Sequence, residues 1–314
     1  MAVIATSGLT KRFSNVTALD QLTLEIGTGV TGLIGSNGAG KSTLIRVLLG
    51  LMPATAGTAQ VLGFDSSSDG GRIREQVGYM PEHDCLPPDV SATEFVVHMA
   101  RMSGLPKAKA RERTADILRH TGLYEERYRP IGGYSTGMRQ RVKLAQALVH
   151  DPKLVLLDEP TNGLDPVGRD DMLALVRRIG RDFGISVLVT SHLLGELERI
   201  SDHVVIIDAG RLLRSSATAD FTRATGMLVV EVHEPPEGGA RDRLGHALAA
   251  AGARVRPSGH VLELQIDGEQ SFDLVRDLAA DLGLGLVRMQ QQRHHIEEVF
   301  RGDRTDQGSN HAAL

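Results

Sequence analysis

The chain has 314 residues, a formal net charge of -4 and 41% hydrophobic residues. That length suffices for one large α/β domain and a smaller companion, while the mildly acidic balance argues against a dedicated nucleic-acid binder. A single cysteine, Cys85, excludes an internal disulfide framework and fits a reducing cytosol. No stretch approaches the roughly 18 apolar residues of a membrane span, and residues 1–13 do not resemble a secretory signal. If the protein works at a membrane, we expect another chain to cross it.

Residues 1–215 predict an α/β core. Short β-rich runs alternate there with helical patterns, which is the rhythm of a mostly parallel sheet with crossover helices. Residues 84–150 interrupt this rhythm, because 92–103, 107–121 and 137–150 have helical patterns with no strand between them. We therefore expect a helical insertion within the core. The strand-like runs are VTGLIG, KLVLLD, ISVLVTS and HVVIID.

The residues after Ala217 follow a different order of elements. The strand-like runs MLVVEVH, RVRP, HVLELQI and GLVRMQ enclose two helical patterns in the order βαββαβ, which suggests a small ferredoxin-like sandwich. We predict an α/β domain over residues 1–218, an α+β accessory domain over 219–302 and a disordered tail over 303–314.

The stretch GLIGSNGAGKST holds a phosphate-binding pattern. Gly35, Gly40, Lys41 and Ser42 satisfy G-x-x-x-x-G-K-[ST] between a strand-like and a helix-like run, which is the context this pattern needs. The glycines let backbone amides turn toward phosphate oxygens, and the helix presents its positive end. Lys41 would bridge the β- and γ-phosphates, and the Ser42 hydroxyl would ligate Mg²⁺. A chance Gly-rich turn is the rival interpretation, and a random match arises in only about 1% of chains this long.

The run KLVLLDEP ends in two carboxylates. Leu154 to Leu157 form a strand-like run that delivers Asp158 and Glu159 to the carboxyl edge of the sheet, beside the phosphate loop. Asp158 would hold Mg²⁺ through water, and Glu159 could polarise the attacking water. An acidic turn without a function is the rival interpretation, and the neighbouring phosphate loop disfavours it.

Further motifs make residues 3–215 resemble an ATP-binding cassette (ABC) ATPase subunit. YSTGMRQR at 134–141 is similar to the family signature, and NGLD at 162–165 is similar to the loop that touches the partner subunit. His192, in TSHLL, matches the family's switch histidine, and Phe13 stands where the family stacks an aromatic ring on adenine. The resemblance implies a P-loop NTPase fold with a parallel-sheet core, a β subdomain and a helical insertion.

The resemblance also implies roles for individual residues. Residues expected to act in hydrolysis are Glu159, His192 and Lys41, and those expected to hold Mg²⁺ are Ser42 and Asp158. Residues expected to contact the ATP of a partner subunit are Ser135, Thr136, Gly137 and Met138, with Asp165 facing the partner itself. The expected ATP-binding residues are Phe13, Ser36, Asn37, Gly38, Ala39, Gly40, Lys41, Ser42, Thr43 and Glu82.

Simpler interpretations exist for several of these residues. Ser135 and Gly137 could be an ordinary helix N-cap and turn glycine. His192 could be a satisfied loop residue, and Phe13 could belong to the core. The company of Asp158 and Glu159 favours a phosphate contact for His192.

The sequence departs from the family pattern in two places. Glu82 stands where the loop after the strand-like EQVGYM usually carries glutamine, and a carboxylate can accept a hydrogen bond but cannot donate one as an amide does. The signature has Thr136 and Met138 where glycine and glutamine are commonest. Both departures bear on coupling to a partner subunit more than on ATP binding.

The C-terminal motif HHIEEVFRG, at 294–302, resembles the end of an extension found on ABC subunits of drug, antibiotic and polysaccharide or lipid exporters. An amphipathic helix that caps a small core is the simpler interpretation. His294 and His295 suggest a metal site, but no matching Cys or acidic set accompanies them.

The resemblance implies an ATP-hydrolysing exporter subunit that couples ATP-driven closure of a dimer, homomeric or heteromeric, to a permease on a separate membrane-spanning chain. It would lie in the cytoplasm, on the inner face of the cell membrane, with no nucleic-acid partner. Two alternatives remain at this point. One is a soluble ABC ATPase that remodels a ribosome, DNA or a protein complex, and the other is a regulatory ATP-binding module without turnover.

Overall fold

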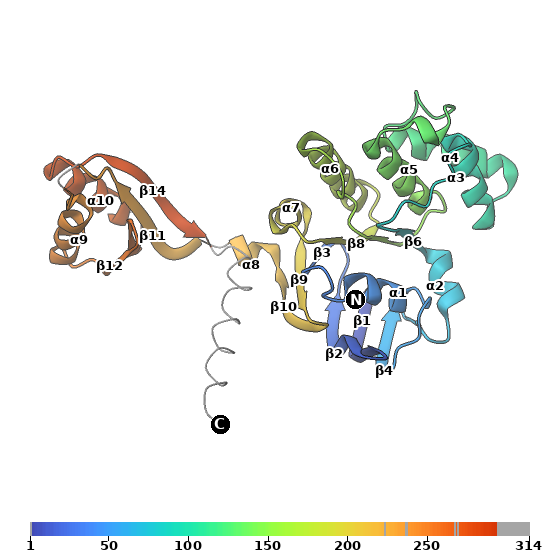
Figure 1. Ribbon diagram of the computed structural model, residues 1–314, viewed down its shortest axis with the longest axis horizontal. Coiled ribbons are helices and arrows are strands. Elements are labelled where there is room, and N and C mark those ends of the chain that lie inside the picture. The colour runs from blue at the N-terminus through green and yellow to red at the C-terminus, as the bar shows by residue number, and fades with distance from the viewer. Residues whose placement is uncertain (1, 223, 236–237, 267, 269, 294–314) are drawn as a thin grey trace. The chain divides into compact units, whose positions relative to one another are not determined.

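The computed structural model describes residues 2–293 except 223, 236–237, 267 and 269. The chain divides into two compact units, Met1–Thr218 and Ala219–Leu314. Each unit has its own hydrophobic core. We describe each unit by itself (Figure 1).

A six-stranded sheet forms the centre of the first unit. Its strand order is β10-β9-β3-β8-β7-β6, and all neighbouring pairs are parallel except β10 with β9. The central strands are buried along their whole length, as expected for parallel strands covered on both faces. The strands are β3 (Val30–Ile34), β6 (Val77–Met80), β7 (Leu154–Leu157), β8 (Ser186–Ser191), β9 (His203–Asp208) and β10 (Arg211–Ala217).

A second, antiparallel sheet belongs to the same unit, with strand order β2-β1-β4-β5. Helix α1 (Lys41–Leu48) packs against both sheets, since Leu44 and Ile45 share a buried core with Leu9 of β1 and Leu33 of β3. Figure 1 shows α1 between the two sheets. The strands are β1 (Ile4–Phe13), β2 (Val16–Ile26), β4 (Ala56–Val61) and β5 (Phe64–Asp65), and the short helix α2 (Gly70–Gln76) leads to β6.

Three helices fill the segment between β6 and β7, as the sequence predicts. They are α3 (Ala92–Met102), α4 (Lys107–His120) and α5 (Thr136–Leu148), and a 3-10 turn, η1 (Ile131–Gly133), precedes α5. Their ends lie within two residues of the predicted ones. The hydroxyl of Ser91 and the carboxylate of Glu94 form a capping box that begins α3.

Two further helices complete the first unit. They are α6 (Pro166–Asp182), which Asp165 caps, and α7 (Leu194–Ile200). Helices α3 to α6 lie on the face of the large sheet opposite α1 (Figure 1). The predicted cassette, with its parallel core, β subdomain and helical insertion, is therefore confirmed.

The second unit has four antiparallel strands in the order β12-β13-β11-β14. With its βαββαβ sequence of elements, this is the ferredoxin-like arrangement that the sequence predicts. The elements are α8 (Thr218–Thr222), which begins at the boundary, β11 (Ala224–Val232), α9 (Ala240–Ala250), β12 (Val255–Ser258), β13 (Val261–Gln265), α10 (Gln270–Asp281) and β14 (Leu286–Arg293). The motif at 294–302, with His294 and His295, and the tail at 303–314 lie outside the described residues.

Candidate functional site

Four neighbouring parallel strands end at the candidate site. The order β3-β8-β7-β6 places the loops that follow these strands next to one another, although they are far apart in the sequence. The phosphate loop follows β3, Glu82 follows β6, Asp158 and Glu159 follow β7, and His192 follows β8. The carboxyl edge of a parallel sheet is where α/β proteins bind ligands.

The phosphate loop wraps the start of α1 tightly. Gly40 has a φ of 105°, and a Cβ there would lie 2.4 Å from the carbonyl oxygen of Ala18. Gly35 is equally confined, because a Cβ would lie 2.6 Å from the carbonyl oxygen of Ile207. Gly38 also has a positive φ, 86°, but open space around it. The loop therefore requires glycine for backbone conformation and for close packing, which leaves the amides free to face a phosphate.

Thr190 fixes both carboxylates that follow β7. Its buried hydroxyl donates to Asp158 Oδ1 at 2.8 Å and accepts the amide N–H of Glu159 at 2.9 Å. Glu159 has a φ of 49°, in the left-handed region that costs a non-glycine residue about 1–3 kcal/mol. The hydrogen bond from its amide to Thr190 stabilises this turn, which directs the Glu159 side chain toward the phosphate loop.

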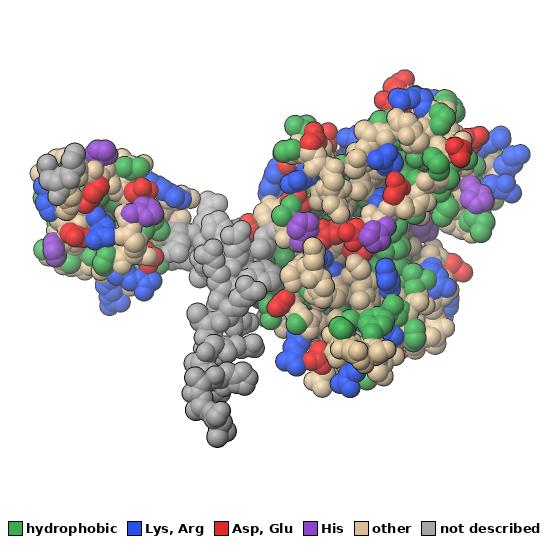
Figure 2. Space-filling view, in the orientation of Figure 1, with side chains coloured by type: hydrophobic (Ala, Val, Ile, Leu, Met, Phe, Trp, Pro, Cys, Tyr) green, Lys and Arg blue, Asp and Glu red, His purple; other side chains and the backbone are tan. Residues whose placement is uncertain are grey.

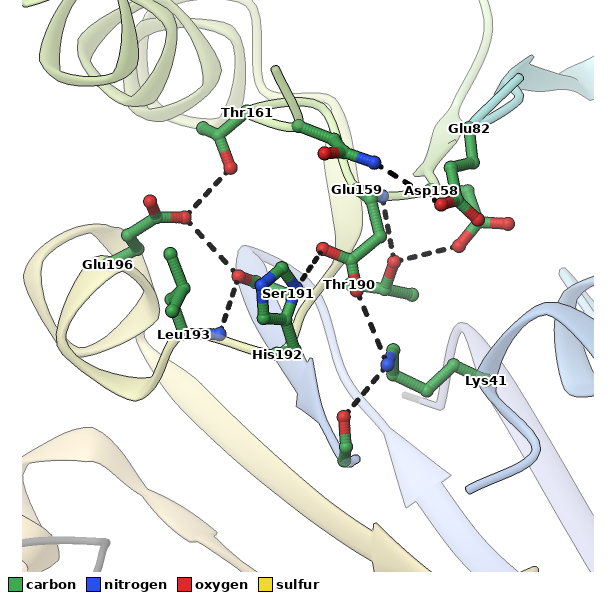
Figure 3. Close-up of polar contacts among 12 residues, drawn as sticks. Lys41, Glu82, Asp158, Glu159, Thr161, Thr190, Ser191, His192, Leu193 and Glu196 are labelled. Carbon is green, nitrogen blue, oxygen red and sulfur yellow. Dashed lines mark hydrogen bonds and ion pairs between the residues drawn. The ribbon is translucent and has the colours of Figure 1, made fainter. Parts of the chain in front are cut away.

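Glu159 lies between a lysine and a histidine (Figure 3). Its Oε1 is 3.3 Å from the Nζ of Lys41, and its Oε2 is 2.9 Å from the Nδ1 of His192. Lys41 also donates to the carbonyl oxygen of Gly35 at 2.8 Å. His192 is therefore in contact with the acid that the sequence pairs with it, and its other ring nitrogen, Nε2, is left for a further partner.

These groups line one pocket of about 520 Å³. Asp158 is 2% exposed and lies behind the lining. Figure 2 shows acidic and histidine side chains gathered across the middle of this unit. The lining residues are Ala18, Ser36, Asn37, Gly38, Ala39, Gly40, Lys41, Ser42, Thr43, Glu82, Glu159, Asn162 and His192.

Phe13 does not line this pocket. It ends β1, is 45% exposed and lies under the ammonium of Lys11, which is 5.2 Å from the ring centroid. An exposed ring at a hairpin is available for stacking, so the simpler assignment to the core does not apply to Phe13.

The signature residues lie in a separate hollow of about 520 Å³. Ser135 caps α5, since its Oγ accepts the amide N–H of Met138 at 3.2 Å. Thr136, Gly137 and Asp165 share the hollow, and the Asp165 carboxylate accepts the amide N–H of Gly168 at 2.8 Å. Within one chain, the signature and the phosphate loop therefore line different pockets.

Sequence reasoning missed a second polar group beside the site. Glu196 Oε2 accepts the hydroxyls of Thr161 at 2.8 Å and Ser191 at 3.2 Å, and Ser191 Oγ accepts the amide N–H of Leu193 at 3.0 Å. Figure 3 shows this group joining the loop after β7 to the loop after β8. Thr190 was missed as well. Thr190 and Ser191 at the end of β8 and Thr161 in the loop after β7 are ordinary residue types at such positions, and only their long-range hydrogen bonds reveal them.

Comparisons with known proteins identify the family of the chain. Residues 19–162 match the family model described as ABC transporter. The chain is 36% identical over 244 residues to the daunorubicin/doxorubicin resistance ATP-binding protein DrrA of Streptomyces peucetius, covering 77% of this chain and 74% of that protein. It is 35% identical over 262 residues to the Nod factor export ATP-binding protein I of Ralstonia nicotianae, covering 83% and 80%.

A solved structure shares the fold of the first unit. It is cbiO1 of Clostridium perfringens, part of the ABC transporter complex cbiONQ, with a TM-score of 0.65 and 27% identity. The similarity covers 70% of this chain and 90% of that one. No helix in the described residues is long and apolar enough to cross a membrane. The chain belongs to the ABC transporter family and is one of its ATP-binding ATPase subunits.

Proposed function

We propose that this chain is the ATP-hydrolysing subunit of an exporter and that it passes the closure of an ATP-bound dimer to a permease on a separate chain. The supporting observation is that Lys41, Glu159 and His192 meet in one pocket with the phosphate loop, whereas Ser135 lies in another. In this proposal residues 1–218 bind nucleotide, 219–302 are an accessory domain, and the permease holds the chain at the inner face of the cell membrane.

The pocket suits a triphosphate. The amides of residues 36–43 would surround its oxygens at the positive end of α1. Lys41 would exchange its contact with Glu159 for the β- and γ-phosphates, and Glu159 would then be free to orient and polarise the attacking water. An imidazolium at His192 could donate one N–H to Glu159 and the other to the γ-phosphate. Phe13 is our candidate for stacking on adenine.

The residues present fit Mg²⁺ bound together with the nucleotide. Glu82 and Glu159 line the pocket, Asp158 lies behind its lining, and the lining lysine Lys41 is already paired with Glu159, so a triphosphate would meet net repulsion without a further positive charge. Among the described residues no group of three or more His, Cys, Asp or Glu could hold a metal. Ser42 and Asp158 would hold the ion together with water and phosphate oxygens, and the ion would neutralise charge on the phosphates.

A second ATP-binding subunit would complete the site. Ser135, Thr136, Gly137 and Met138 begin α5, where a hydroxyl and amides can address a phosphate, and no phosphate loop lines their hollow. A head-to-tail pair would bring this hollow over the partner's ATP, with Asp165 at the contact. Such contacts exist only while the γ-phosphate is present, so hydrolysis would release the pair. We propose a homodimer, with a heterodimer as the alternative outcome.

The direction of transport is inferred from the relatives. DrrA is named for daunorubicin and doxorubicin resistance, and the Ralstonia protein is named for Nod factor export. A third relative, 36% identical over 212 residues, is the bacitracin transport protein BcrA of Bacillus licheniformis. We therefore propose that the chain powers export, and that a drug-like or antibiotic-like compound is the substrate class.

Glu159→Gln tests the proposal, because it removes the carboxylate and keeps the shape of the side chain. We expect ATP hydrolysis to fall by about 100-fold or more, while ATP binding persists and gel filtration shows an ATP-dependent dimer. The tagged variant, purified with ATP from native membranes, should carry a stoichiometric integral membrane protein. Glu112→Gln, at an exposed carboxylate of α4, is the matched control. Unchanged hydrolysis in Glu159→Gln, or recovery without any membrane protein, would contradict the proposal.

A further inference from the structure

Helix α5 carries a buried lysine that the site described above does not use. Lys143 is 3% exposed. Its ammonium donates to the carbonyl oxygens of Pro81 at 2.8 Å and Glu82 at 2.9 Å, and lies 3.5 Å from that of His83. These three consecutive carbonyls hold the ammonium, and no ion pair of Lys143 with a carboxylate is present among the described residues.

A lysine is a costly residue for such a position. Burial lowers the pKa of Lys143, although the nearby Cys85, Asp84, Glu82 and Asp158 favour its charged form. An apolar residue would fill the same helix position without the desolvation cost of an ammonium. Packing alone therefore does not explain a lysine at this position. The loop at residues 81–83, to which Lys143 donates, suggests a functional role.

The segment that Lys143 holds belongs to the ATP pocket. Glu82 lines that pocket, and its Oε1 accepts the amide of Asn162 at 3.3 Å. Gln140, also on α5, donates to the carbonyl oxygen of Asn162 at 3.1 Å. Arg139 adds an exposed contact, with its Nε 3.5 Å from Asp84. One helix thus grips both the loop after β6 and the loop after β7.

The same helix begins with the signature. Ser135 caps its N-terminus and lies in the other hollow. Lys143 follows eight residues later, a distance of roughly 12 Å along a rigid helix. Because α5 is continuous from Thr136 to Leu148, a displacement of the Glu82 loop must either carry the start of α5 with it or break the contacts of a buried ammonium.

We propose that Lys143 is a positioning residue that makes the Glu82 loop and the signature helix move as one body. Nucleotide bound in contact with Glu82 then determines the position of Ser135 relative to the γ-phosphate of ATP on the partner subunit. This inference rests on the proposed function, since it assumes that both hollows bind parts of ATP. If Lys143 leaves the loop, its charge stays buried without a partner, which makes the separated arrangement unfavourable.

Lys143→Met tests this inference, because it keeps an unbranched side chain and removes the charge and the donors. We expect binding of a fluorescent ATP analogue to stay within about threefold of wild type, because the phosphate loop is untouched. We expect kcat and ATP-dependent dimerisation, the latter measured in the Glu159→Gln background, to fall about 10-fold or more with little change in KM. Lys153→Met, at an exposed lysine just beyond α5, is the matched control and should behave like wild type.

Hydrogen exchange separates positioning from mere support of the fold. At concentrations where the chain is monomeric, ATP should protect both residues 81–84 and residues 136–140 of wild type. In Lys143→Met, ATP should still protect the loop but no longer the start of α5. If Lys143→Met does not fold, Lys143→Gln, which keeps a donor without the charge, takes its place with the same readouts.

Three results would overturn the inference. The first is that the Lys143→Met and Lys153→Met proteins have the same kcat and the same ATP-dependent dimerisation. The second is that Lys143→Met loses ATP binding as much as it loses kcat. The third is that ATP protects residues 136–140 of Lys143→Met as much as it does in wild type. Failure of the proposed function is a different result. In that case wild type would not hydrolyse ATP, and the Glu159→Gln protein with Lys143 intact would not dimerise with ATP.

Discussion

Thr190→Val should damage the site without changing the size of the residue. The substitution removes the hydroxyl group and both of its hydrogen bonds. The hydroxyl donates to the Asp158 carboxylate at 2.8 Å and accepts the amide N–H of Glu159 at 2.9 Å. A hydrogen bond to a charged group contributes about 1.5–3 kcal/mol, and a buried amide left unpaired costs about 1–3 kcal/mol. Because solvation and relaxation recover part of this, we expect the free energy of unfolding to fall by roughly 2–4 kcal/mol.

Hydrolysis should also fall in Thr190→Val. Asp158 and Glu159 would lose the group that orients them, and loss of such support typically costs about 10–100-fold in metal affinity or activity. We expect a lower kcat and a higher Mg²⁺ requirement. Thr190→Ser keeps the hydroxyl and deletes one methyl group, so it should lose only about 1 kcal/mol and retain most of its activity.

Tyrosine fluorescence during urea unfolding can measure this loss. The chain has four tyrosines and no tryptophan, and all four, Tyr79, Tyr124, Tyr128 and Tyr134, belong to the unit Met1–Thr218. The signal therefore reports the unit that contains Thr190, whatever the second unit does. If the valine variant were as stable and active as wild type, or if serine did as much damage as valine, the assigned role of the hydroxyl would be wrong.

Three further predictions follow from individual contacts. Gly40→Ala should weaken binding of a fluorescent ATP analogue at least about 10-fold, because its Cβ would lie 2.4 Å from a carbonyl oxygen; Gly38→Ala, in open space but at positive φ, should lose less in the same titration. Ser91→Ala removes a helix cap and should cost about 1 kcal/mol in urea unfolding. Burial lowers the pKa of His150, so the unfolded chain binds the proton more readily than the folded chain. The free energy of unfolding should therefore fall as pH drops through roughly 6.5. Urea unfolding measured as a pH series should show a smaller fall for His150→Gln than for wild type.

Much of the site could be predicted from sequence because its residues stand in short local patterns. The phosphate loop must begin a helix after a strand, and the acidic pair must end a strand, so their places at one sheet edge follow from the parallel order. The βαββαβ order of the second unit was likewise readable from alternating runs. Local sequence patterns were therefore sufficient to predict both the fold and the phosphate-binding loop.

The residues that sequence reasoning missed act across long separations. Thr190 reaches Asp158 from the neighbouring strand, and Lys143 reaches Glu82 over 61 positions. Neither residue type is unusual in a strand or a helix, so no local pattern marks it. Lys143 was even less visible, because a lysine on a helix is normally solvated, and only its burial shows that its charge is used inside the protein.

The charges of Glu82 and Lys143 are complementary. A carboxylate at position 82, where the family usually has glutamine, adds negative charge to a site that already holds Asp158 and Glu159. Lys143 donates to the carbonyl oxygen of Glu82 itself, so its positive charge stands behind the same loop. Burial lowers the pKa of Lys143, and electrostatic attraction from Asp84, Glu82 and Asp158 partly offsets this. The departure from the family pattern thus strengthens the link between the ATP pocket and α5, because a carboxylate side chain at position 82 attracts the nearby ammonium, whereas a neutral amide would not.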